Sequence, residues 1–229
     1  MRYLVKFEKT LRRNPYKGLY ICLEGIDGSG KSTQVEKIKK HFEKSGKKVT
    51  VTSEPMAEGP IQKLIRDALF AKVKIPPRAY QALYSADRGV NHATVVEPAL
   101  KRGEVVLTHR SNWSTIPHGI IDLGQEYSFS HKAWPIATAH GLLSYYHEFI
   151  NPDITFYLKI SARKAVERLK SMSKVKDGYE KGEKLAKIVY GYDTEVAKFP
   201  EEFTVIDGEQ EEDEVTKDII DIIEKRSYK

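Results

Sequence analysis

A glycine-rich segment near the start of the chain has the residue types and spacing of a phosphate-binding loop. Residues 25–32 read GIDGSGKS, which matches the pattern G-x-x-x-x-G-K-S. Its glycines let successive backbone N–H groups turn toward a polyphosphate. In this pattern Lys31 reaches the β- and γ-phosphates, and the hydroxyl of Ser32 coordinates Mg²⁺. The residues predicted to bind the polyphosphate of a nucleotide are Gly25, Asp27, Gly28, Ser29, Gly30, Lys31, Ser32 and Thr33.

The neighbouring sequence supplies the elements that such a loop requires. The apolar run 19–23 precedes it, and the helix-compatible segment 34–42 follows, so that a strand leads through the loop into a helix. The helix begins near Lys31, and the positive end of its dipole favours an anion. A strand–loop–helix unit in this order predicts a nucleotide-binding protein.

Further strands and helices alternate along the rest of the chain. Two helices are expected at 60–69 and from Pro76 to about residue 100, each opened by a proline. Short apolar strands separated by helices predict an α/β fold of the P-loop NTPase type, with a five-stranded parallel sheet covered on both faces. Ligands of such sheets bind at the carboxyl ends of the strands. The four further strands are expected at 48–52, 104–108, 153–160 and 203–207.

The domain organisation is expected to be simple. Residues 1–18 precede the first core strand and end in turn-forming residues, so we interpret them as an N-terminal extension. Residues 19–229 form a single domain. A polar stretch near 170–183 contains Gly178 and Gly182 and suits a mobile flap or a kinked pair of helices.

Composition indicates a globular protein of the cytoplasm. Hydrophobic residues make up 40% and charged residues 31% of the 229, and Cys22 is the single cysteine. The chain therefore forms no internal disulfide, and it has neither a signal-peptide core nor an apolar run that could span a membrane. The net charge is +6, but 32 acidic residues are interspersed, which favours a site for anionic small molecules over nucleic-acid binding.

The loop and its flanks resemble one family in particular. Residues 23–34, LEGIDGSGKSTQ, are similar to the opening of the thymidylate kinases. Further segments match the family in the same order, and the resemblance extends from about residue 20 to 207. These segments are SEP at 53–55, LIRD at 64–67, LYSADR at 83–88, PALKRG at 98–103, PDITFYL at 152–158 and ERL at 167–169.

This resemblance implies transfer of the γ-phosphoryl group of ATP to dTMP, giving ADP and dTDP for dTTP synthesis. It assigns the catalytic roles to Lys31, which would bridge the donor phosphates, and to Arg110, which would bind the acceptor phosphate. A guanidinium suits that role because it holds two phosphate oxygens and stays protonated. Nucleotide substrates and a homodimer are implied as well. The residues assigned to the acceptor side are Asp27, Glu54, Tyr84, Arg88, Arg110, Ser114 and Thr115.

The family gives these acceptor-side residues separate roles, although each has an ordinary structural alternative. Asp27 would accept from the sugar 3′-hydroxyl, or stabilise its own turn. Tyr84 would stack on thymine, or pack in the core. Arg88, four residues on, would contact the polar edge of the base, or stand as a solvated charge on the helix. Ser114 and Thr115 would line the site, or cap a helix.

Several positions depart from the family pattern. His109 stands where an aspartate near Mg²⁺ is usual, and His118 where a tyrosine near the sugar is usual. Imidazole is a poor ligand for Mg²⁺, which leaves Glu54 as the best candidate for a carboxylate near the metal. With Ser29 in the loop, the family's arginine for the γ-phosphate is absent there. Other departures are Ser53, residues 56–59, Ser111 and Lys159, and the flap offers Lys174 and Lys176 in place of an arginine.

These departures leave other functions open. One alternative is a kinase for a different acceptor, either another nucleoside monophosphate such as dUMP or a deoxynucleoside. Another is a degenerate paralogue that binds nucleotide without turnover. A switch-type or motor ATPase is disfavoured because no strand ends in the acidic residues that would polarise a water molecule.

Overall fold

The predicted parallel sheet is present in the computed structural model, which describes residues 11–70, 72–124, 149–172 and 178–227. All five strands run parallel in the order β2-β3-β1-β4-β5, as expected from the alternating pattern. Each begins and ends within one residue of its predicted limits. The strands are β1 (Leu19–Glu24), β2 (Val49–Ser53), β3 (Val105–His109), β4 (Ile154–Lys159) and β5 (Phe203–Asp207).

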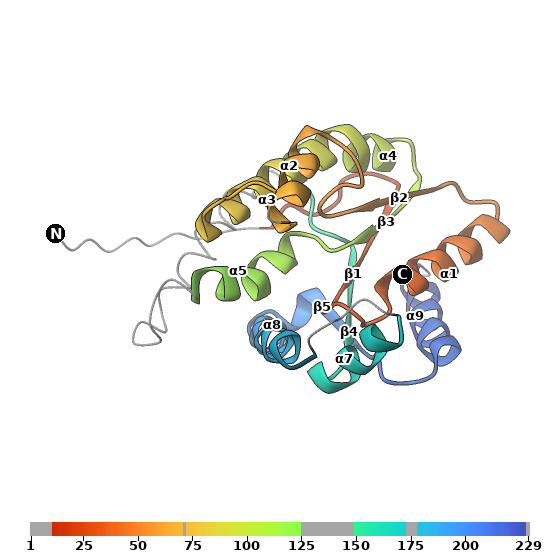
Figure 1. Ribbon diagram of the computed structural model, residues 1–229. Coiled ribbons are helices and arrows are strands. Elements are labelled where there is room, and N and C mark those ends of the chain that lie inside the picture. The colour runs from red at the N-terminus through yellow and green to blue at the C-terminus, as the bar shows by residue number, and fades with distance from the viewer. Residues whose placement is uncertain (1–10, 71, 125–148, 173–177, 228–229) are drawn as a thin grey trace.

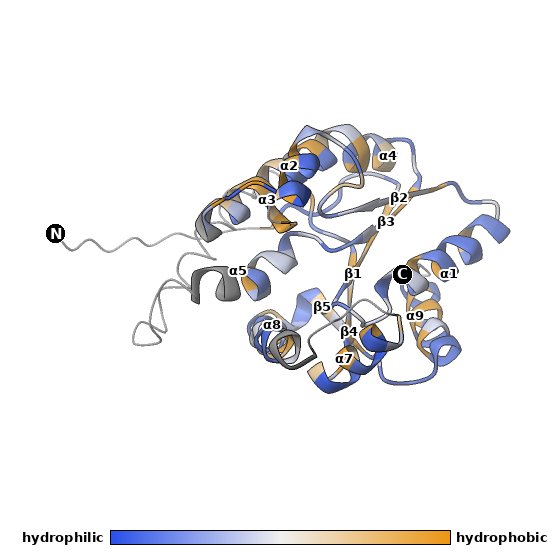
Figure 2. Ribbon diagram, in the orientation of Figure 1, coloured by the Kyte–Doolittle hydropathy of each residue, from blue (hydrophilic) through white to orange (hydrophobic). Residues whose placement is uncertain are grey.

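Helices cover both faces of the sheet (Figure 1). α1 and α9 pack on one face, while the helices that follow β2, β3 and β4 lie on the other. In Figure 2 the strands at the centre are largely in the hydrophobic colours, and α1 turns a hydrophilic surface outward. The α-helices are α1 (Lys31–Lys44), α2 (Pro60–Leu69), α3 (Pro77–Asn91), α4 (Glu97–Lys101), α5 (Thr115–Gly124), α7 (Ala162–Ser171), α8 (Gly178–Lys198) and α9 (Glu212–Ser227).

The long helix predicted after Pro76 is interrupted near its end. α3 stops at Asn91, a π-helical turn follows (η1, His92–Val96), and α4 completes the segment. Pro98 lies in the first turn of α4 and has no N–H to donate to a preceding carbonyl. The wider π turn just before it accommodates that missing hydrogen bond.

Residues 11–18 pack at the amino-terminal edge of the sheet. The guanidinium of Arg13 pairs with the buried carboxylate of Glu202, and Asn14 donates to Asp153 over 2.8 Å. Asp153 also accepts from the backbone N–H of Tyr20 at 2.7 Å, which ties this segment to the start of β1. This edge lies opposite the carboxyl ends of the strands. The division into an extension and a single domain stays a prediction.

The segment predicted to be a flap is only partly described. α7 ends at Ser171 and α8 begins at Gly178. Lys174 and Lys176 lie outside the described residues. In the part of the chain that the structure describes, no helix combines the length and the apolar character needed to cross a membrane.

One helix contact is tight enough to test by mutation. A Cβ added to Gly191 of α8 would lie 2.6 Å from Cα of Pro117 in α5, whereas one added to Gly182 would have its nearest neighbour at 3.6 Å. Gly191→Ala should therefore lower the free energy of unfolding by about 1–3 kcal/mol through overpacking. Gly182→Ala, in the same helix, should raise it by up to about 1 kcal/mol through helix propensity. Urea denaturation measures both, and an unchanged Gly191→Ala protein would contradict this contact.

Candidate active site

The phosphate-binding loop connects β1 to α1 with the geometry predicted from its spacing. Gly28 has φ of +84°, and a Cβ there would lie 2.9 Å from the backbone carbonyl oxygen of Ala165 in α7. Gly30, also with positive φ, is the N-cap of α1, and the backbone N–H of Gln34 donates to its carbonyl. The loop therefore presents the N-terminus of a 14-residue helix to an anion.

Lys31 lies folded inside this loop. Its Nζ donates to the carbonyl oxygens of Gly25 and Ile26, both at 2.9 Å, and lies 3.5 Å from Oγ of Ser29. Burial, reinforced by the charge of Arg110, lowers the pKa of Lys31 to about 7. The ammonium group is thus held inside the loop, where burial disfavours its charged form.

The predicted metal ligand, Ser32, lies beside His109, which stands where the family usually has an aspartate. Its exposed hydroxyl is 3.4 Å from Nδ1 of His109, at the end of β3. Burial and the nearby charges of Lys31 and Arg110 lower the pKa of His109, so its imidazole is neutral at pH 7. The described residues contain no cluster of three or more His, Cys, Asp and Glu side chains suited to a metal. A single hydroxyl ligand fits Mg²⁺ that is otherwise held by nucleotide phosphates and water.

The carboxylate of Glu24 is the centre of a buried hydrogen-bond network. Glu24 ends β1, is fully buried, and lies directly before the loop. The backbone N–H and the hydroxyl of Ser111 donate to its Oε1 at 2.7 and 3.0 Å. The hydroxyls of Ser114 and Tyr192 both donate to its Oε2 at 2.7 Å. Glu24 therefore joins β1 to the segment after β3 and to α8.

Arg110 lies between this network and the phosphate-binding loop. Its Nη2 pairs with Oδ1 of Asp27 at 2.9 Å, and its Nη1 donates to Nε2 of His118 at 2.7 Å. The same Nη1 lies 3.4 Å from the hydroxyls of Ser114 and Tyr192. Arg110 also has a positive φ of 67°, an unfavourable conformation of the kind that functional sites retain.

The charges around Arg110 keep its guanidinium protonated and its histidine neighbour neutral. Burial lowers the pKa of Arg110, but the combined effect of Tyr192, Asp27, Glu24 and Tyr84 raises it above the ordinary value. Burial and the Arg110 charge lower the pKa of His118 well below its usual range. A neutral His118 accepts from Arg110, which requires its proton on Nδ1.

A second arginine, Arg88, is buried near the partly buried Arg110. Arg88 of α3 forms an ion pair with Glu54 and donates to Oγ1 of Thr115 at 3.2 Å and to the carbonyl of Ser111 at 3.1 Å. Burial outweighs the attraction of Arg88 and raises the pKa of Glu54 to about 7. The Oε2 atom of Glu54 is thus engaged by Arg88, and a position of Glu54 near the metal stays a prediction. Tyr84, also on α3 and half-buried, lies near enough to Arg110 to influence its pKa.

The structure therefore brings most of the predicted site residues to one edge of the sheet. The register pairs Leu23 with His109 and His109 with Ser53, so β1, β2 and β3 end side by side. Sequence reasoning missed Tyr192, because it is one of 13 tyrosines and stands in a segment without a recognisable motif. Lys159, another departure, ends β4 and pairs with Asp193 of α8 at 2.9 Å.

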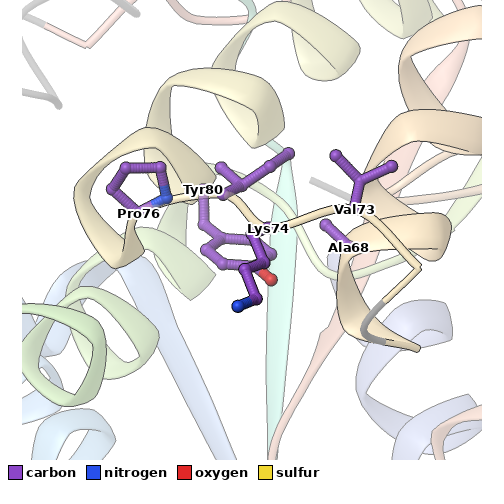
Figure 3. Close-up of a pocket in the computed structure, with 6 residues that line it drawn as sticks. Ala68, Val73, Lys74, Pro76 and Tyr80 are labelled. Atoms are coloured by element: carbon purple, nitrogen blue, oxygen red, sulfur yellow. The ribbon is translucent and has the colours of Figure 1, made fainter.

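A hollow between α2 and α3 is separate from these residues. It has a volume of about 500 Å³ and is lined by apolar side chains and by Lys74. Figure 3 shows Tyr80 and Pro76 on one side of the hollow and Val73 and Ala68 on the other. No predicted site residue lines it, and we assign it no role in the chemistry.

The parallel sheet and the loop at the end of β1 define the class of P-loop nucleotide-binding proteins. Within that class, the family model described as "Thymidylate kinase" matches residues 23–219. The chain belongs to the thymidylate kinase family.

Individual relatives agree with this assignment. A protein of Thermosipho africanus named thymidylate kinase is 33% identical over 210 residues, which cover 90% of this chain and 98% of the relative. A protein of the same name from Citrifermentans bemidjiense is 32% identical over 200 residues, covering 83% of this chain and 84% of the relative. The similarity extends over nearly the whole length of the first relative and most of the second, as expected from the ordered motifs.

The lowered pKa of Lys31 predicts proton uptake when nucleotide binds. Phosphates beside Nζ would favour the ammonium form and raise the pKa of Lys31 above about 7. At pH 8, where the nucleotide phosphates are already ionised, ADP binding should take up as much as about one proton. Below about pH 6 the uptake should vanish, because Lys31 is protonated beforehand.

Calorimetry in buffers of different ionisation enthalpy measures this uptake. Lys31→Arg is the matched control, since a guanidinium stays charged and should take up no proton. Absence of uptake by the unmodified protein at pH 8 would contradict the environment described for Lys31.

Proposed function

We propose that this protein transfers the γ-phosphoryl group of ATP to dTMP, giving ADP and dTDP. The main support for this proposal is the position of Arg110. It stands at the end of β3 and contacts Asp27 of the phosphate-binding loop over 2.9 Å, so that a phosphate-binding guanidinium faces the donor site. Membership of the thymidylate kinase family supports dTMP as the acceptor.

On the donor side, the loop from Gly25 to Thr33 would hold the phosphates of ATP. Its backbone N–H groups and the N-terminus of α1 would bind the phosphate oxygens, and Lys31 would bridge the β- and γ-phosphates. Ser32 would hold Mg²⁺, which supplies neutralisation of phosphate charge when bound. Phosphoryl transfer through a loose transition state depends mostly on such positioning and charge.

On the acceptor side, Arg110 would bind the phosphate of dTMP and Asp27 its 3′-hydroxyl. Tyr84 and Arg88, on one face of α3, would contact the thymine ring and its polar edge. Glu54 and Thr115 would act by holding Arg88 in place, since both contact its guanidinium in the buried part of the site. Ser114 would hold Arg110 in the same way.

The other functions considered receive less support. Both relatives described above are named thymidylate kinase, which favours dTMP over dUMP or a deoxynucleoside. The contact of Arg110 with the loop favours a phosphorylated acceptor. Intact Lys31 and Ser32 argue against a paralogue without turnover. We further expect a homodimer located in the cytoplasm.

Acceptor-dependent release of ADP tests this function. The purified protein should release ADP from Mg²⁺–ATP in the presence of dTMP, at least about tenfold faster than with dUMP or thymidine, and at background without acceptor. Equal rates with dUMP would select the alternative acceptor. Nucleotide binding without turnover of any acceptor, in a protein shown to be folded, would select the degenerate paralogue.

His109 provides a separate test of the metal site. His109→Asp should lower the Mg²⁺ concentration needed for half-maximal activity several-fold, because Mg²⁺ prefers carboxylate oxygen to imidazole nitrogen. His109→Asn, which offers no charge, is the matched control and should not lower it. If the two variants behave alike, His109 does not lie near enough to the metal to influence it.

A further inference from the structure

Two hydroxyl groups lie between the carboxylate of Glu24 and the guanidinium of Arg110. The hydroxyl oxygens of Tyr192 and Ser114 are each 2.7 Å from Oε2 of Glu24 and each 3.4 Å from Nη1 of Arg110. The two oxygens are 3.0 Å apart. They form a bridge from the end of β1 to the arginine that follows β3.

The chemistry of the three groups fixes the direction of these hydrogen bonds. An ionised carboxylate only accepts hydrogen bonds, so Tyr192 and Ser114 must donate their hydroxyl hydrogens to Glu24. Their oxygen lone pairs are then left to accept from Arg110, which only donates. Glu24 thus makes both hydroxyls acceptors on the side that faces the guanidinium.

Tyr192 is held rigidly in this position. Its side chain is fully buried and stacks on Tyr157 of β4, with ring centroids 5.0 Å apart and an interplanar angle of 22°. The preceding residue, Gly191, packs closely against Pro117 of α5. The hydroxyl therefore has little freedom to follow a displaced arginine.

We propose that Tyr192 is a positioning residue that orients Arg110 toward the acceptor phosphate. The bridge and His118 hold the Nη1 side of the guanidinium, while Asp27 contacts Nη2 from the open side. The side chain of Asp27 is 56% exposed, against 16% for Arg110, so a phosphate can approach from the Asp27 side. The inference rests on the role proposed for Arg110 in binding that phosphate.

Removal of the Tyr192 hydroxyl tests the proposal. Tyr192→Phe keeps the stacked ring and should raise the Kd for dTMP about tenfold, because a hydrogen bond to a charged group is lost. The Kd for ADP should change by less than about twofold. Tyr190→Phe, on the same helix with a 69% exposed side chain, is the matched control and should leave both constants unchanged.

Comparison of the change in Kd for dTMP with the change in Kd for ADP separates a loss of Arg110 orientation from a general loosening of the structure. Glu24 leads directly into the phosphate-binding loop, so a disrupted network would weaken ADP and dTMP binding together. Equal weakening of both, or no effect on dTMP, would overturn the proposal. Glu24→Gln is a comparison variant that should weaken dTMP and ADP binding together, because its amide N–H₂ group donates and disrupts the network next to the phosphate-binding loop.

Arg110→Gln distinguishes failure of this inference from failure of the proposed function. That variant should weaken dTMP binding, and adding Tyr192→Phe to it should then have no further effect, since the group being oriented is gone. If Arg110→Gln binds dTMP normally, the role of Arg110 is wrong and the inference falls with it. If Arg110→Gln weakens dTMP binding but Tyr192→Phe does not, only the inference is overturned.

Discussion

The buried carboxylate of Glu24 is the interaction on which the rest of the site depends. A carboxylate removed from water must be hydrogen-bonded, and Glu24 accepts from Ser111, Ser114 and Tyr192. These donors come from the segment after β3 and from α8, so the carboxylate joins parts of the chain that lie far apart in sequence. Because Glu24 also opens the phosphate-binding loop, the same residue connects the donor half of the site to the arginine of the acceptor half.

The sheet could be predicted from the sequence because its strands are short apolar runs between helices. Such runs are buried when they form the central strands of a sheet covered by helices, and β1 to β5 lie where those runs occur. The helices were harder to predict. The long helix after Pro76 was expected, but not its π turn, which depends on one proline near the end of the segment. α9 was not predicted, although its acidic first turn and basic last turn are typical of a helix.

The site residues could be predicted from the sequence only where they belong to a recognisable motif. The spacing of Gly25, Gly30, Lys31 and Ser32 is enough to predict a phosphate-binding loop, and this loop joins β1 to α1 as expected. The contacts of Arg110 could not be read in the same way, because they join residues separated by up to 83 positions in the chain. Tyr192 lies 168 residues from Glu24, and only the folded arrangement shows that their side chains meet. Glu54 is a further example, because its buried ion pair with Arg88 of α3 could not be predicted from its residue type.

We infer that the Glu24 network presents Arg110 to the acceptor phosphate while the loop holds the donor. A crystal structure with dTMP and ADP bound tests it most directly. We expect the dTMP phosphate within about 3 Å of the Arg110 guanidinium, with the hydroxyls of Tyr192 and Ser114 still hydrogen-bonded to Glu24. A dTMP phosphate bound away from Arg110, or a network that comes apart when the acceptor binds, would contradict it.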